Sequence, residues 1–170
     1  MSVESLDGPP ARRALVLGLG NALMTDDAFG HHMINALQGR FRFPADVTVL
    51  DGGTLGLDLL PQLEGIGRLL VIDALEMGAP PGTVFRLEGE EVPRAFASKL
   101  SVHQMGLQDL LAVAELQGHL PAELVVWGVQ PKSTEMGLEL TPPVAGAMED
   151  AIAGVLSELQ RWGVELRRAA

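Results

Sequence analysis

Short apolar segments alternate with helix-like segments along this chain. Four apolar runs have the length of buried strands and are bounded by turn residues, at 13–19, 47–50, 68–74 and 124–129. A fifth run, 83–87, alternates only in part between apolar and polar residues, which favours an edge strand and allows an antiparallel one. The pattern predicts that these strands pair into one sheet.

Helical signals fill the intervals between the strands. The predicted helices follow Asp26, cover 57–63, follow a capping box formed by Ser101 and Gln104, and run from Thr141-Pro142 to Gly163. In the first of them Phe29, Met33 and Leu37 recur every four residues, and Asp26 is placed to cap the amino end. Strands that alternate with helices indicate an α/β fold, with helices on both faces of a mostly parallel sheet.

The length of the chain, 170 residues, is that of one ordinary domain. We expect a loose polar segment over 1–12, a single α/β domain over 13–163 and a short tail over 164–170. The first of these lacks the apolar stretch of a signal peptide, and no run approaches the roughly 18 apolar residues of a membrane span. We therefore expect a cytoplasmic protein with no membrane partner.

Composition removes several classes of site. The chain has no cysteine, which excludes disulfides, thiolate metal sites and a cysteine nucleophile. Its net charge is −10, from 12 basic and 22 acidic residues, whereas nucleic acids and anionic membranes attract a basic surface. Nucleic acid is therefore not expected as a partner.

Polar residues follow the predicted strands where ligands bind in such folds, at the carboxyl ends. Asp26 and Asp27 follow the first strand, Asp51 ends the second, Asp73 ends the third, and His103 begins a later helix. A carboxylate at the end of an apolar strand is costly unless something pairs with it, which favours a functional role for Asp73. Asp51, before two glycines, also suits a simple turn. We expect these side chains to gather on one rim.

The histidines leave alternatives open. His103 in a first helical turn should stay neutral, and a neutral imidazole near carboxylates is a good ligand for a divalent metal. His31 lies four residues after Asp27 and could chelate with it if the helix begins early enough. His32 points about 100° away from His31 on a helix, so the two cannot act together. His119, beside Gly118, is expected to be an exposed loop residue.

Common catalytic and nucleotide motifs mostly fail. Gly18-x-Gly20 begins like a dinucleotide-binding fingerprint, but Leu23 stands where the third glycine belongs. Asp51 does stand where an acid that binds ribose could stand, so a nucleotide module is a weak alternative. The chain has no phosphate-binding P-loop, no zinc-binding H-E-x-x-H and no G-x-S-x-G nucleophile turn.

Several segments in order resemble the nickel-iron hydrogenase maturation endopeptidases. They are LVLGLGNALMTDDAFG (15–30), LDGGTLGLDLL (50–60), VIDALEMGAPPGT (71–83), SVHQMGLQDLL (101–111), WGVQP (127–131) and GLELTPPV (137–144). The resemblance implies a cytosolic protease with a twisted five-stranded sheet between helices, a three-layer αβα domain. It also implies a partner, the hydrogenase large-subunit precursor, which loses a short C-terminal extension after nickel is inserted.

The same resemblance implies the site residues. The metal-contacting residues of the family fall on Asp27, Asp73 and His103, and its substrate-handling turn falls on Asp51-Gly52-Gly53. The family places Glu or Asp at the first of these positions. Nickel would be carried in by the substrate rather than held tightly, and the ion could activate a water, or Asp27 or Asp73 could act as an aspartyl-type general base. A metal-binding adaptor without catalysis is the other alternative.

Overall fold

The computed structural model describes residues 13–97 and 102–169, and its centre is a five-stranded sheet with the order β3-β1-β4-β6-β5. The strands are β1 (Ala14–Leu19), β3 (Val47–Gly53), β4 (Arg68–Ala74), β5 (Val84–Glu88) and β6 (Glu123–Val129). All neighbours are parallel except β5, which runs antiparallel to β6 at one edge. The mostly parallel α/β sheet and the antiparallel edge strand are confirmed.

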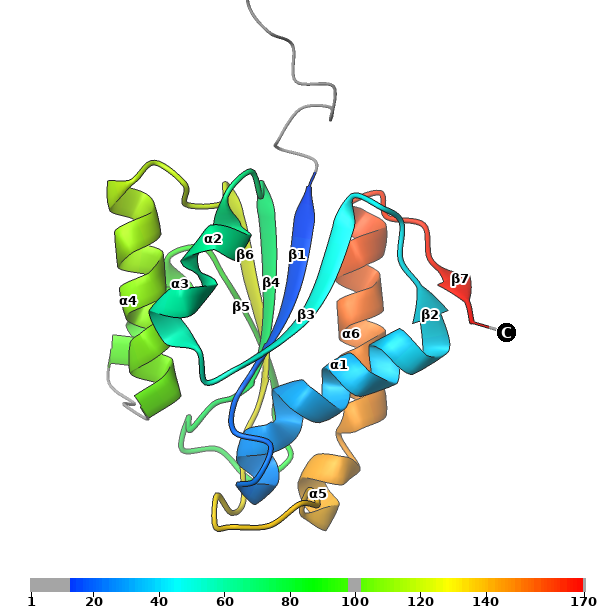
Figure 1. Ribbon diagram of the computed structural model, residues 1–170. Helices are drawn as coiled ribbons and strands as arrows, with labels where there is room; N and C mark the ends of the chain where they lie inside the picture. The colour runs from blue at the N-terminus through cyan, green and yellow to red at the C-terminus, as the bar shows by residue number, and fades with distance from the viewer. Residues whose placement is uncertain (1–12, 98–101, 170) are drawn as a thin grey trace, which may run out of the picture.

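Helices cover both faces of the sheet and form three layers (Figure 1). They are α1 (Phe29–Arg40), α2 (Leu60–Leu63), α3 (Glu91–Ala97), α4 (Val102–Leu116), α5 (Pro142–Ala145) and α6 (Met148–Arg161). On one face α1 and α6 pack against one apolar cluster, and on the other face α2 and α4 pack against a second. The described part of the chain contains no helix long and apolar enough to cross a membrane.

Alternate residues of the central strand, β4, contribute to the two apolar clusters on opposite faces of the sheet. Leu70, Ile72 and Ala74 of β4 belong to the α1/α6 cluster. Leu69 and Val71 belong to the α2/α4 cluster. This strand is buried on both faces, which explains its unbroken apolar sequence.

Several element predictions need correction. The helix predicted from Thr141 to Gly163 is two helices, because Ala147 donates to the carbonyl of Val144 and so breaks the ladder next to Gly146. The helix predicted over 57–63 is a 3-10 turn, Gly56–Leu59, followed by the single turn of α2. Neither α3 nor the two-stranded ladder of β2 (Phe41–Arg42) and β7 (Arg167–Arg168) was predicted; the ladder pairs the C-terminal segment with the chain after α1.

Candidate functional site

The candidate site lies at the carboxyl ends of the parallel strands, the lower edge of the sheet in Figure 1. Here β1 leads into the loop that carries Asp27, and Asp51 and Asp73 lie near the ends of β3 and β4. The amino end of α4, where residue 103 lies in the backbone, is at the same edge, because its carboxyl end leads back to the start of β6. The topology therefore brings the predicted site segments to one rim.

Asp73 is a buried carboxylate one residue before the end of β4. Strand alternation turns its side chain toward the α2/α4 face, the side to which Val71 and Leu75 contribute. Its Oδ1 accepts a hydrogen bond from the amide of Ala74 at 2.8 Å. Across the ladder it faces Gly128 of β6, where a Cβ atom would lie 2.5 Å from the side chain of Leu75. Glycine at position 128 thus leaves room for the side chain of Leu75, beside a carboxylate that apolar packing alone does not explain.

Asp27 lies in a 3-10 turn, Thr25–Ala28, between β1 and α1. Its Oδ2 accepts the amide of Asn21 at 2.9 Å, which holds the carboxylate against the start of the loop. The next helix sits directly on the sheet, because a Cβ atom at Gly30 would lie 2.4 Å from the carbonyl oxygen of Leu19 and 2.6 Å from that of Ile72. Glycine at this position therefore brings the Asp27 loop down onto the ends of both β1 and β4.

Asp51 lies on the opposite face of the sheet from Asp73. Its Oδ2 lies 2.6 Å from Nδ1 of His31 on α1, and its Oδ1 accepts the amide of Gly53 at 3.3 Å. The next residue, Gly52, is buried against Leu17 on the α2/α4 face. The expected rim is therefore present, but its carboxylates do not all face the same way. His31, offered by the sequence as a partner of Asp27, pairs with Asp51 instead.

The helix-cap interpretation of Asp26 is wrong. The side chain is fully buried and makes no cap hydrogen bond. Its Oδ2 accepts the amides of Lys132 and Ser133 at 2.8 and 3.1 Å and the hydroxyl of Thr141 at 2.7 Å, while its Oδ1 accepts the amide of Thr141 at 2.8 Å. Asp26 thus joins the loop after β1 to the segment after β6.

That junction is reinforced by the backbone. Thr25, a β-branched residue at φ +51°, donates its amide to Gly137 at 2.9 Å, and Gly137 donates in turn to Leu23 at 2.8 Å. A threonine in the left-handed region is strained and persists only where its surroundings hold it there. The Asp27 loop is therefore held in place by hydrogen bonds with a segment more than 100 residues later in the sequence.

Removing the carboxylate of Asp26 should destabilise the fold in a pH-dependent way. Burial acts to raise the pKa of Asp26, but hydrogen bonds from Thr141, Ser133 and Lys132 outweigh it and hold the pKa below its ordinary value. In Asp26→Asn the NH₂ group must face at least one of these donors and cannot accept its hydrogen bond. We expect the free energy of unfolding to fall by roughly 2–4 kcal/mol at neutral pH. Urea unfolding of both proteins measures it.

The sign of the pH effect follows from the lowered pKa. The folded state disfavours protonation of Asp26. The carboxylate therefore contributes fully to the free energy of unfolding above the ordinary carboxyl pKa, and this contribution is lost as the pH falls through the lowered pKa. The difference in free energy of unfolding between the wild type and Asp26→Asn should therefore become smaller in acid. Asp46→Asn, at an exposed position, is the control and should change little. A gap that is constant or grows in acid would contradict the assignment.

The two adjacent histidines of α1 differ. His31 is a third exposed, whereas Nε2 of His32 is buried with no hydrogen-bond partner among the described residues. Burial, followed by the neighbouring His31, lowers the pKa of His32, and a hydrogen bond with the backbone of Leu138 opposes this only in part. His32 is thus a neutral packing residue next to the 131–141 segment.

The predicted metal ligands are only partly visible. Among the side chains that the structure describes, no group of three His, Asp or Glu residues is arranged to hold a metal ion. The side chains of Ser101 and His103 lie outside that set, so the capping box and the ligand set Asp27, Asp73 and His103 stay predictions. His119 is exposed after α4, as expected.

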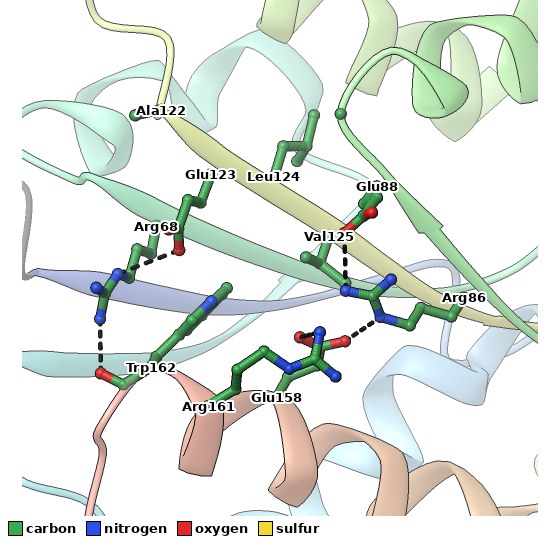
Figure 2. Close-up of a pocket in the computed structure, with 11 residues that line it drawn as sticks. Arg68, Arg86, Glu88, Ala122, Glu123, Leu124, Val125, Glu158, Arg161 and Trp162 are labelled. Carbon is green, nitrogen blue, oxygen red and sulfur yellow. Dashed lines mark hydrogen bonds and ion pairs between the residues drawn. The ribbon is translucent and has the colours of Figure 1, made fainter.

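A hollow of about 460 Å³ lies at the opposite edge of the sheet, near the amino ends of β4 and β6 (Figure 2). Its arginines are each paired: Arg68 with Glu123 at 3.2 Å, and both Arg86 and Arg161 with the buried Glu158. Glu88 also pairs with Arg86, at 2.9 Å, so three carboxylates balance the three arginines. The cluster therefore ties α6 to the sheet and leaves no net positive charge for a ligand. The candidate site therefore remains the rim at the carboxyl ends of the parallel strands.

Known proteins of similar sequence match this chain over most of its length. A family described as "Hydrogenase maturation protease" matches residues 31–158. The hydrogenase 2 maturation protease of Escherichia coli (strain K12) is 42% identical over 154 residues, which are 90% of this chain and 94% of that protein. The chain belongs to the hydrogenase maturation protease family. It is therefore a hydrolase of the endopeptidase type.

Other relatives of this maturation protease extend the match. The hydrogenase expression/formation protein HupD of Rhodobacter capsulatus is 42% identical over 160 residues, 93% of this chain and 76% of that protein. The solved structure of the maturating endopeptidase HybD from E. coli superposes with a TM-score of 0.88 at 41% identity, over 92% of this chain and 97% of that one. The three-layer fold and the family resemblance are confirmed.

The sequence alone did not reveal the hydrogen bonds that join the Asp27 loop to the segment after β6, nor the partner of Asp51. Both depend on contacts between distant residues, such as Asp26 with Thr141, which carry no local signal. The acid directly before Asp27 was the only trace of these hydrogen bonds in the sequence, and we interpreted it as a helix cap.

Proposed function

We propose that this maturation protease removes the C-terminal extension of the nickel-iron hydrogenase large-subunit precursor after nickel has been inserted. The observation that carries the proposal is the placement of Asp27 and Asp73 at the carboxyl ends of β1 and β4, at the edge where α4 begins. The names of the relatives, such as hydrogenase 2 maturation protease, supply the substrate class.

The residues at this rim suit a nickel ion that arrives with the substrate. Two carboxylates and the imidazole of His103 would leave coordination positions for ligands of the substrate, and carboxylate and imidazole donors both accept Ni²⁺. The bound ion would polarise the scissile carbonyl or lower the pKa of a water. The protease would then cut only a precursor that already carries nickel.

The carboxylates have roles of their own in this proposal. Asp27, which is partly exposed and held by the amide of Asn21, would accept a proton from the attacking water. Asp73, buried beneath the rim, would fix the position of the ion or of the water. Hydrolysis adds the water's oxygen to the carbonyl carbon and passes its proton to the leaving amine, so no protein nucleophile is needed.

The alternatives fare worse. A nucleotide module would need the third glycine of the fingerprint, but Leu23 there is 57% exposed, and α1 begins six residues later, at Phe29. A non-catalytic adaptor would bind the precursor and leave it intact, in a family named for protease activity. The cytoplasmic location expected from the sequence stays a prediction.

Nickel-dependent cleavage is the test. We expect the full chain to shorten a nickel-loaded large-subunit precursor by its C-terminal peptide and to leave the nickel-free precursor intact, as measured by intact-protein mass spectrometry. Removal of nickel from the precursor by a chelator before mixing should abolish cleavage, and reloading should restore it. Equal cleavage of both forms would remove the role of nickel, and cleavage of neither would overturn the proposed function.

A further inference from the structure

The surface beside the candidate site carries a row of three polar side chains that the mechanism above does not use. Asn35 Nδ2 lies 3.2 Å from Nε2 of His31, and Nδ1 of His31 lies 2.6 Å from Oδ2 of Asp51. The row runs along one face of α1 and ends on the last residues of β3. Asp51 is thus held from the side of α1.

The donors and acceptors in this row select one tautomer of the His31 ring. The Nδ2 of Asn35 can only donate, so Nε2 of His31 must accept, and Nδ1 must carry the proton that it donates to Asp51. The other oxygen of Asp51 accepts the amide of Gly53 at 3.3 Å. Both oxygens of Asp51 are therefore engaged, and its carboxylate is fixed in one orientation.

The turn that Asp51 fixes is in contact with the loop of the proposed catalytic carboxylate. The carbonyl of Gly53, at φ +53°, accepts the amide of Gly20 at 3.0 Å. Gly20 in turn lies against Asp27, whose carbonyl oxygen would be 1.9 Å from a Cβ atom at that position. A shift of the turn at 51–53 would therefore be passed directly to Asp27.

We propose that His31 is a positioning residue, which acts through Asp51 to fix the turn Asp51-Gly52-Gly53 against the Asp27 loop and the bound substrate chain. This inference rests on the proposed function, because it assigns His31 a role in the same cleavage. A pair that is about a third exposed contributes little to stability, so an effect on cleavage can be separated from an effect on folding.

The activity test is a double-mutant cycle on nickel-loaded precursor. We expect His31→Ala and Asp51→Ala each to lower kcat/KM by roughly tenfold or more, since small misplacements near reacting groups are costly. If His31 acts through Asp51, adding His31→Ala to Asp51→Ala should cost nothing further. Multiplying losses, or full activity in His31→Ala, would overturn the inference while the wild type still cleaves. A wild type that does not cleave overturns the proposed function itself, and this inference with it.

Two further variants separate positioning from mere packing. Asparagine places its amide nitrogen where Nδ1 of histidine lies, so His31→Asn should recover most of the activity lost in His31→Ala, and failure to do so would contradict the role of the donor. His119→Ala, at an exposed histidine after α4, is the matched control and should cleave like wild type. All variants should unfold at nearly the wild-type urea midpoint.

A spectroscopic measurement tests the geometry independently of cleavage. Nitrogen-15 NMR of the histidine rings should show His31 protonated at Nδ1 and unprotonated at Nε2, and Asn35→Ala should loosen this preference. A ring protonated at Nε2, or one that averages between the two tautomers in the wild type, would overturn the proposed row of hydrogen bonds.

Discussion

Asp27→Asn and Asp73→Asn are expected to lower cleavage of the nickel-loaded precursor by about 10²–10⁴-fold, the range usual for loss of a general acid–base group. Asparagine keeps the shape and the hydrogen-bonding oxygen but cannot take a proton or offer a negative charge to a metal. For Asp27 the remaining oxygen can still accept the amide of Asn21, so the loop should keep its conformation. Single-turnover cleavage followed by mass spectrometry measures the loss.

The control for this prediction keeps the charge. Asp27→Glu retains a carboxylate one methylene further out, at a partly exposed position, and should keep measurable cleavage. His103→Ala should behave like the asparagine variants if residue 103 completes the ligand set. Near-wild-type cleavage by both Asp27→Asn and Asp73→Asn would show that the reacting groups lie elsewhere.

The roles proposed for Asp73 and Asp51 predict different effects of their loss on kcat and KM. Asp73 is buried, so its loss should act mainly on the bound complex and lower kcat. Asp51 belongs to the turn proposed to handle the substrate, and its loss should raise KM at least as strongly as it lowers kcat. These profiles would separate Asp73, which is proposed to position the ion or the water, from the substrate-handling turn.

The strands of this fold were readable because burial on both faces leaves long apolar runs. The segment at 68–74 coincides with β4, and its single acid, Asp73, stood out against that background. The edge strand β5 was recognisable by its weaker alternation. In contrast, β2 and β7 are two residues each and are held by pairing with one another, so no periodicity could reveal them.

That Asp27, Asp51 and Asp73 lie at one rim of the sheet was predictable from the sequence, but the directions of their side chains were not. Which face of the sheet a strand residue occupies depends on the register, and Asp51 lies opposite Gly18 with its side chain toward α1. The helix on that side begins at Phe29 rather than directly after Asp26, which places His31 beside β3. Asp26 itself is bound by residues 106 to 115 positions away, and only the folded chain brings them together.

The tightest contact in the proposed site is that between Gly20 and Asp27. Gly20 has φ +120°, a region that side chains rarely adopt, and its amide bonds Gly53 at 3.0 Å. A Cβ atom there would lie 1.9 Å from the carbonyl oxygen of Asp27, which belongs to the backbone and cannot rotate away. The turn after β1 can therefore hold its shape only with glycine at this position.

Gly20→Ala is accordingly expected to destabilise the protein by roughly 2–6 kcal/mol, the sum of backbone strain and overpacking. Because relief of the clash must move the Asp27 loop, cleavage should fall even under conditions where the variant stays folded. Urea unfolding and cleavage of nickel-loaded precursor measure the two effects. Gly39→Ala is the matched control: nothing lies within 4 Å of its added Cβ atom on α1, and alanine there should leave cleavage unchanged and raise stability by about 0.5–1 kcal/mol. Wild-type stability and activity in Gly20→Ala would mean that the loop yields freely, and that glycine here does not set the position of Asp27.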